Sequence, residues 1–265
     1  LKQITIDVTG KLTKNRSGLS LGKGLLQRHT PGAALTEAQL AKLGVVGATL
    51  DMTRGVELRA HIDDDTIEDN QDNKNFDQEQ YDTFGQGFSN DLAYLAFVGT
   101  ADNAAAGAPF NELSKGFLTV AAESTLSSKA TSAIVANDRG QTIENALYKV
   151  IDSMHEDAVD ASTIYMNPTD YRNYVRRIAK DYKALALLKK GDLLTIENVP
   201  LSPQSGIPSG TYLATPPKNM VMGLSSRVKR VRWWENDISS LCYKFIVYPD
   251  FEFDIEKWVT LVTEV

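Results

Sequence analysis

The sequence predicts an α+β fold with long projections near its N-terminus, and three observations support this prediction. Two segments, at residues 76–99 and 142–154, repeat apolar residues at spacings of three and four, as amphipathic helices do. The region after residue 210 alternates apolar and polar residues, which is typical of antiparallel strands. The first 35 residues are rich in glycine and lack helical periodicity, so they indicate an extended arm.

The arm is followed by a segment with the pattern of a hairpin. A short helix is expected over 37–43, because Thr36 can cap it and Gln39 completes a capping box. Residues 45–62 have strand composition, with Arg54-Gly55 as a turn or bulge, and they lead into an acidic tract. Strand, turn, strand and polar tract together predict a projecting hairpin.

The first long helix has clear signals at both ends. Asp77 and Gln80 fit a capping box at its start, and Gly99 is expected to end it. Gly85 and Gly87 weaken a helix by up to about 1 kcal/mol each relative to Ala. We therefore expect close packing at these two glycines.

The middle of the chain is expected to alternate strands and helices. Residues 117–122 are interpreted as a short strand, 124–132 as a polar connection and 163–166 as a buried strand. Asn167-Pro168 provides an N-cap followed by Pro at the first helical position. The inner face of the helix that begins at Pro168 is predicted to carry Tyr171, Tyr174, Val175, Ile178 and Tyr182.

The rest of the chain is predicted to be strands around one loop at 202–210, which is rich in Pro, Gly and Ser. The expected strands are 193–199, 211–215, 220–224, 227–233, 241–248 and 251–265.

Composition argues against an enzyme. The chain of 265 residues has a formal net charge of −6, one cysteine and three histidines. One cysteine excludes an intramolecular disulfide, and so few histidines leave little material for a catalytic or metal site. For the same reason we expect no cofactor. No stretch is apolar for about 18 residues, and no secretory signal is visible, so we also expect no membrane segment.

Charge is strongly segregated along the chain. Residues 1–36 hold six basic residues against one acid, whereas residues 57–82 hold ten acids against two basic residues. Solvated loops explain each block separately. Their alternation in sign also suits complementary contacts between copies of the chain. The candidate subunit-interface residues are Lys11, Lys14, Arg16, Lys23, Arg28, Asp63, Asp64, Asp65, Glu68, Asp69, Arg227, Lys229, Arg230 and Arg232.

Several possible chemical sites have simpler explanations. Asp63 to Asp65 could attract a metal, but Glu68 replaces the turn glycine of a calcium loop, so a solvated acidic face fits better. Cys242 lies in an alternating strand and reads as a buried structural thiol. The basic stretch 227–234 could hold a nucleic-acid backbone with its tryptophans stacking on bases, or it could form a polar sheet face or subunit contact.

Three ordered groups of short motifs carry a resemblance. They lie at residues 90–118, with Gly99-Thr100 and then Lys115-Gly116-Phe117-Leu118; at 144–171, with Asn167-Pro168-Thr169-Asp170; and at 199–220. Their order and spacing resemble the major capsid proteins of tailed bacteriophages, the Hong Kong 97 (HK97) type of fold. The resemblance covers about the last 180 residues, and the first 75 match only as an arm and a hairpin.

The resemblance implies an HK97-like α+β capsid fold and a non-enzymatic role. The implied function is a major capsid protein that self-assembles into the icosahedral head shell around the double-stranded DNA of a tailed bacteriophage. The implied regions are 1–36, N-arm; 37–75, E-loop hairpin region; 76–125, peripheral domain with spine helix; 126–218, axial domain; and 219–265, peripheral domain with C-terminal strands.

Partners and location follow from the same resemblance. The chain would bind itself in hexamers and pentamers, with portal, scaffold and decoration proteins as further partners. It would enclose DNA without sequence-specific binding and reside in the virion after assembly in the host cytoplasm. Cleavage of a scaffolding segment would suit a chain that begins at Leu1. Covalent crosslinking is not expected, since residues 57–75 offer only Lys74.

Two other classes of protein remain open. One is a shell of the same fold, either an encapsulin-like nanocompartment or a gene-transfer-agent particle. The other is a metal-dependent hydrolase that uses Asp63 to Asp65 with His61.

Overall fold

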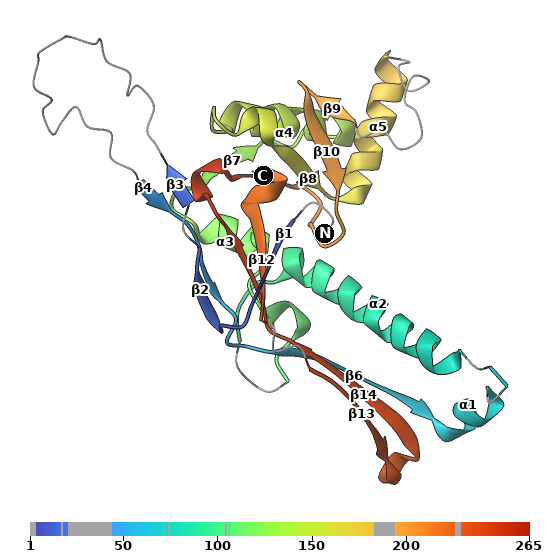
Figure 1. Ribbon diagram of the computed structural model, residues 1–265. Helices are drawn as coiled ribbons and strands as arrows, with labels where there is room; N and C mark the ends of the chain where they lie inside the picture. The colour runs from blue at the N-terminus through green and yellow to red at the C-terminus, as the bar shows by residue number, and fades with distance from the viewer. Residues whose placement is uncertain are drawn as a thin grey trace, which may run out of the picture.

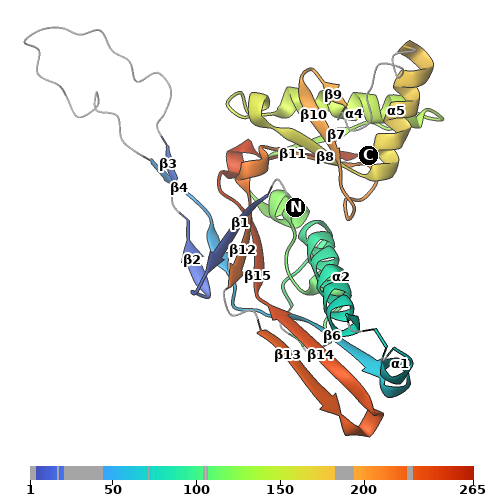
Figure 2. The same cartoon turned by 45° about the vertical axis from the view of Figure 1, so that its right-hand side comes forward.

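The computed structural model describes residues 4–16, 18–20, 44–70, 72–73, 75–103, 105, 107–182, 194–225 and 229–265. A rounded unit holds helices α4 (Arg139–Ser153) and α5 (Pro168–Tyr182), and helix α2 (Phe76–Val98) leads away from it (Figure 1). Three long strands run with α2 to a far tip, and a narrow ladder of strands projects from the other side of the molecule (Figure 2). The predicted α+β class with long projections is confirmed.

The rounded unit is built on a six-stranded sheet with the order β7-β16-β11-β8-β10-β9. Ile143, Leu147 and Val150 of α4 are fully buried against it, and burial of such a side chain contributes about 1.5–3 kcal/mol. The expected Asn167 cap is confirmed, since Thr169 N donates to Asn167 Oδ1 at 2.7 Å. The strands are β7 (Ser128–Ser132), β8 (Thr163–Met166), β9 (Thr195–Ile196), β10 (Val199–Pro203), β11 (Thr211–Thr215) and β16 (Thr260–Glu264).

A three-stranded sheet forms the middle of the molecule: β1 (Thr5–Thr9), β12 (Met220–Ser225) and β15 (Pro249–Phe253). The short helix α3 (Phe117–Glu123) packs on β15, where the Phe117 ring lies 5.5 Å from that of Phe251 and 5.3 Å from that of Phe253. These buried rings fix the end of α2 to the sheet, because Phe97 also contacts Phe117 at 5.9 Å between ring centroids.

Two glycines allow the backbone at the end of α2 to approach the backbone just before α3 closely. A Cβ on Gly99 would lie 2.1 Å from the Ser114 carbonyl oxygen, and one on Gly116 would lie 2.8 Å from the Ala96 carbonyl oxygen. Gly116 N donates to Gly99 O at 2.9 Å. The glycines of the first motif group are therefore required by close backbone approach.

The long projection consists of β6 (Val56–Asp63), β14 (Ser240–Val247) and β13 (Lys229–Glu235), in the order β13-β14-β6, with α1 (Asp64–Asp69) following β6. Helix α2 lies along one face of this sheet (Figure 1). Ring pairs join the two layers, with centroids 5.8 Å apart for Tyr81–Phe245 and 5.4 Å for Phe84–Tyr243. These contacts stiffen the projection over the first half of α2.

The second projection is an antiparallel ladder, which we call the N-terminal hairpin (residues 13–16, 18–20 and 44–51). Strand β2 (Thr13–Asn15) pairs with β5 (Thr49–Asp51), and β3 (Gly18–Ser20) pairs with β4 (Gly44–Val46). Its base is anchored by Leu50 and Met52, which are fully buried against Val221 of β12. Gly223 makes room for them, since a Cβ there would lie 3.0 Å from Leu50 Cδ1.

The predicted pairing of the N-terminal segments is wrong. Residues 5–9 belong to the middle sheet rather than to a free arm, and residues 45–62 do not form a hairpin with themselves. Strand β5 pairs with β2, whereas β6 pairs with β14 near the other end of the chain. Local patterns identify strands but not distant partners, which explains the error. The predicted break at Arg54-Gly55 is confirmed between β5 and β6, and the helix expected over 37–43 lies outside the described residues.

Other predictions about single elements are corrected. Residues 117–123 are helix α3, because Phe117 and Ala121 lie one turn apart and are both fully buried. The connection at 124–132 contains β7, which gains its strand conformation by pairing with β16. The strand expected over 193–199 is confirmed at 195–196 as β9, but it ends in a turn with positive φ at Glu197 and Asn198, after which β10 begins at Val199. The last strand is interrupted by a 3-10 turn at Glu256–Trp258, so β15 and β16 join different sheets.

The ends of α2 are explained in part. Gly99 is its C-cap, as predicted, but its N-cap is Asn75 and not a capping box at Asp77. The prediction of close packing at Gly85 and Gly87 is wrong for contacts within the described chain, since a Cβ on either residue would meet no atom within 4 Å.

Candidate functional site: the charged surfaces

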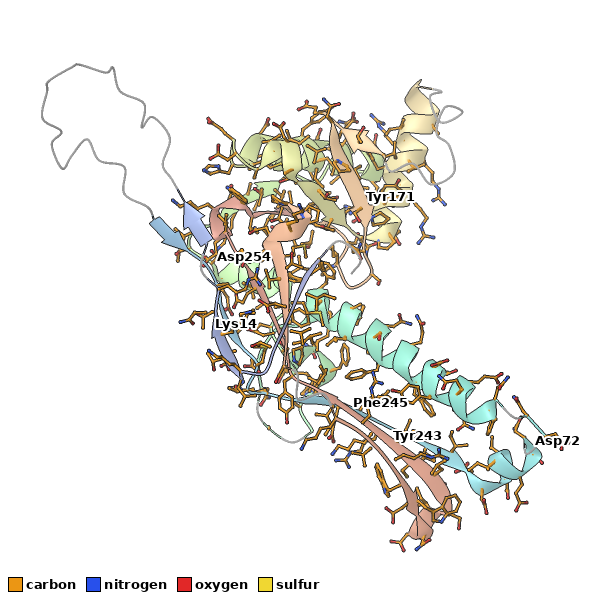
Figure 3. The ribbon with its side chains drawn as sticks, in the orientation of Figure 1. Lys14, Asp72, Tyr171, Tyr243, Phe245 and Asp254 are labelled. Carbon is orange, nitrogen blue, oxygen red and sulfur yellow. The ribbon has the colours of Figure 1, made fainter. Side chains whose placement is uncertain are left out.

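Four charged residues join the base of the N-terminal hairpin to the middle sheet, and we call them the hairpin clamp (Lys14 and Arg16 of the hairpin, Asp7 of β1 and Asp254 after β15). Arg16 Nε and Nη2 donate to the two carboxylate oxygens of Asp254 at 2.7 and 2.9 Å. Lys14 Nζ donates to the Asp7 oxygens at 2.7 and 2.9 Å, and Arg16 Nη1 also donates to Asp7. Figure 3 shows Lys14 and Asp254 at this junction.

The clamp is electrostatically matched. The hydrogen bond from Lys14, together with Arg16, holds the pKa of Asp7 below its ordinary value. The hydrogen bond to Asp254 raises the pKa of Arg16. The Asp7 side chain is only 10% exposed, so its charge depends on these cations.

The sequence-predicted basic residues of the N-terminal block therefore have different roles. Lys14 and Arg16 pair within the chain, whereas Lys11 is exposed, and no carboxylate in the described ranges pairs with it. Lys23 and Arg28 lie outside the described residues. Intrachain pairing was missed because the alternating strand pattern does not reveal which carboxylates come from distant strands.

The predicted acidic surface lies at the far tip of the long projection. Asp63 ends β6 and accepts from Ser240 Oγ at 2.9 Å. The carboxylates of α1 that follow it are exposed, and Asp72 marks the same tip in Figure 3. His61 Nε2 lies 3.8 Å from Asp63 Oδ1. Among the residues that the structure describes, no group of three or more His, Cys, Asp or Glu side chains is placed to hold a metal ion. These aspartates therefore lack the geometry that the hydrolase hypothesis needs.

The predicted basic strand is β13, on the opposite edge of the same sheet, with Arg227 outside the described residues. Arg230 lies over the Tyr81 ring at 5.3 Å and donates to its hydroxyl, and Arg232 lies over the Tyr243 ring at 5.7 Å. A groove of about 400 Å³ runs between this part of β13, β14 and the start of α2. We call it the arginine–tyrosine groove; Figure 3 shows Tyr243 and Phe245, which line it, and the other lining residues are Asn75, Gln78, Tyr81, Arg230, Val231, Arg232 and Lys244.

A second, smaller pocket of about 190 Å³ lies beside the hairpin base. Asp250 and Glu252 of β15 face it, and Asp51 N donates to Asp250 Oδ2 at 2.6 Å. Burial raises the pKa of Asp250 to about 6, and burial together with the charges of Asp250 and Glu256 raises the pKa of Glu252 to about 7. The other charged groups that face them are Asp51, Arg54, Asp102 and Lys115, and Arg54 Nη1 pairs with Asp102 Oδ2 at 2.7 Å.

A buried ionic cluster fixes the rounded unit. Asp170, 1% exposed, accepts from Arg139 Nη2 at 2.7 Å, from Ser209 Oγ at 2.9 Å and from Gly210 N at 2.8 Å. Arg139 also pairs with Glu264, which accepts from Tyr212 Oη at 2.6 Å. Burial of the Tyr212 hydroxyl and its bond to Glu264 raise the pKa of Tyr212. The sequence contained one signal for this cluster, Asp170 in the Asn167-Pro168 motif, but it did not show the partners.

The remaining sequence candidates in the described part of the chain are Cys242, His61 and His155. Cys242 is buried in β14, as predicted, and His61 and His155 are exposed. No helix in the described part of the chain is long and apolar enough to cross a membrane.

Comparison with known proteins yields structural matches over the whole chain. A chain of the satellite phage P4 procapsid, from a structure that includes the size determination (Sid) protein, matches with a TM-score of 0.72 and 11% identity over 99% of this chain and 85% of that one. The capsid of a native GTA particle matches with a TM-score of 0.65 and 13% identity over 100% of this chain and 89% of that one. The chain has the HK97 capsid fold. A structure of Microbacterium phage Oxtober96 matches with a TM-score of 0.59 and 15% identity over 100% of this chain and 90% of that one. No protein-family model and no curated protein sequence matches this chain.

This fold accounts for the shape of the chain. The identities are only 11–15%, whereas the structural matches cover 99–100% of this chain with TM-scores of 0.59–0.72. The resemblance in the short motifs is therefore confirmed at the level of fold.

Proposed function

We propose that this chain is a major capsid protein that self-assembles, as hexamers and pentamers, into the icosahedral head shell of a tailed bacteriophage around its double-stranded DNA. The observation that carries the proposal is the match over 99–100% of the chain to capsid chains of phages and of a GTA particle. It has no catalytic role, and its location is the virion. Portal, scaffold and decoration proteins are its further partners.

The two projections support an assembly role. A compact domain can meet only its nearest neighbours, whereas an extended hairpin and a long sheet with a helix on one face reach beyond them. We assign the role of spine helix to α2 and the axial domain to the rounded unit. The E-loop was expected over residues 37–75; we now assign it to the N-terminal hairpin, because β5 pairs with β2 and β6 pairs with β14. The net charge of −6 also suits a wall that encloses DNA without gripping it.

A GTA capsid is the second candidate, because two GTA capsid structures match over the whole chain. Such a shell has the same fold, so the contents of the particle distinguish the two candidates. A phage genome supports the first, random host DNA supports the second, and a cargo enzyme would indicate a nanocompartment.

Negative-stain microscopy of the expressed protein tests the proposal. We expect hollow icosahedral particles, or capsomer rings where scaffold is needed. A protein that remains monomeric at tens of micromolar, alone and with the neighbouring gene products of its genome, would contradict it.

A further inference from the structure

The long projection has two edges of opposite charge. Strand β6 with α1 forms one edge and β13 forms the other, and β14 separates them (Figures 1 and 2). Two inter-strand spacings make the distance from β6 to β13 about 10 Å. The two edges therefore point away from each other, and within one chain they do not neutralise each other.

The acidic edge is centred on α1. Asp64, Asp65, Glu68 and Asp69 are all exposed, and no residue of this helix is buried. In the part of the chain that the structure describes, no cation lies within ion-pair distance of Asp65 or Glu68. These two side chains are three residues apart and share one face of the helix.

The basic edge combines charge with apolar surface. Lys229 and Arg230 are exposed, and no carboxylate in the described ranges pairs with either. Val231 is 46% and Trp234 44% exposed on the same strand. The guanidinium of Arg230 is held over Tyr81 at the mouth of the arginine–tyrosine groove, so it is oriented before any partner arrives. Beyond β13 the sheet has no further strand in the described structure, which leaves this edge accessible.

We propose that α1 of one copy docks on the β13 edge of a second copy, with Asp65 and Glu68 facing Lys229, Arg230 and the arginine–tyrosine groove. The inference rests on the proposed function and names one of the contacts of that shell. Charge complementarity identifies the second copy as the occupant, because the same chain supplies both surfaces and cannot join them internally. The contact joins two different surfaces, so in a closed shell its heterologous repetition would run around a symmetry axis instead of making an isolated dimer.

Two charge-reversal variants provide the test. Variant A carries Lys229→Glu and Arg230→Glu, and variant B carries Asp65→Lys and Glu68→Lys. Each variant alone confronts like charges at the contact, so we expect its association to weaken at least about tenfold. A mixture of A and B presents opposite charges again at every A–B contact, and we expect its association into pairs and even-numbered rings to recover to within about threefold of the unmodified protein, whereas a five-membered ring cannot alternate A and B.

Sedimentation velocity measures the association, and electron microscopy counts the shells. Circular dichroism of each variant confirms that it folds, and reversal of the exposed Lys149 and Arg172 in the rounded unit serves as the matched control. Association of A or B at the unmodified level, or failure of the folded mixture to recover, would overturn the inference. If either of these results is found while the unmodified protein still forms particles, the proposed shell function remains supported and only the docking contact is refuted. Recovery of association in the mixture, together with an unmodified protein that forms no particles, would support the contact and count against the shell.

Discussion

The hairpin clamp makes a sharp prediction, because one arginine joins three elements of the fold. Replacement of Arg16 by Ala removes the two hydrogen bonds to Asp254 and the bond to Asp7. The base of the N-terminal hairpin should then open more often, while Leu50 and Met52 remain anchored in the middle sheet. We expect local loosening of the β2–β5 ladder without global unfolding.

The magnitude follows from the geometry. A hydrogen bond to a charged group contributes about 1.5–3 kcal/mol when it is buried. The Arg16 and Asp254 side chains are 23% and 29% exposed, so solvent screening reduces these values. Three such bonds with this screening give about 2–3 kcal/mol in all, which corresponds to an increase in local opening of roughly 30- to 150-fold.

Amide hydrogen exchange measures this opening directly. The amide of Met52, which donates to Leu12 O at 2.7 Å, and those of the β2–β5 ladder should lose protection by that factor. Lys11→Ala removes the same charge two residues before the hairpin begins but breaks no ion pair in the described structure, so it should change protection little. Equal loss of protection in both variants would show that net charge, and not the clamp, holds the hairpin.

Three further predictions concern stability. Gly99→Ala should prevent folding, because its Cβ would lie 2.1 Å from a backbone oxygen, and the yield of soluble protein checks this. Gly85→Ala should stabilise the folded protein by up to about 1 kcal/mol, which the midpoint of urea unfolding measures. Asp170→Ala should cost about 3–5 kcal/mol, since it leaves buried donors unpaired, and exposed Asp152→Ala should stay within about 0.5 kcal/mol in the same urea titration. The pKa of Glu252 is raised from 4.5 to about 7, so the folded state binds this proton more tightly and the free energy of unfolding falls as pH rises through this range. Glu252→Gln should flatten that pH dependence, and equal slopes for the variant and the unmodified protein would contradict the prediction.

The sequence predicted those elements whose stability comes from near neighbours. Strand β8 and helices α2, α4 and α5 were found because their apolar spacing is a local signal, as are the caps at Gly99 of α2 and Asn167 of α5. The pairing of β6 with β14 could not be predicted, because each strand is consistent with many partners and the choice is made by tertiary packing. Helix α3 was mistaken for a strand for the same reason, since its buried face depends on β15.

The charged surfaces illustrate how far sequence reasoning about charge can go. The blocks of opposite sign predicted contacts between copies, yet Lys14 and Arg16 satisfy carboxylates of their own chain. What distinguishes a residue available to a neighbour is the absence of an intrachain partner, and that property depends on folding. Of the described candidates, Asp65, Glu68 and Lys229 meet this condition and lie on the two edges of one projection. Since reversing either edge alone and mixing the two variants test the same contact from both sides, the mixture separates a specific pairing from a general effect of net charge.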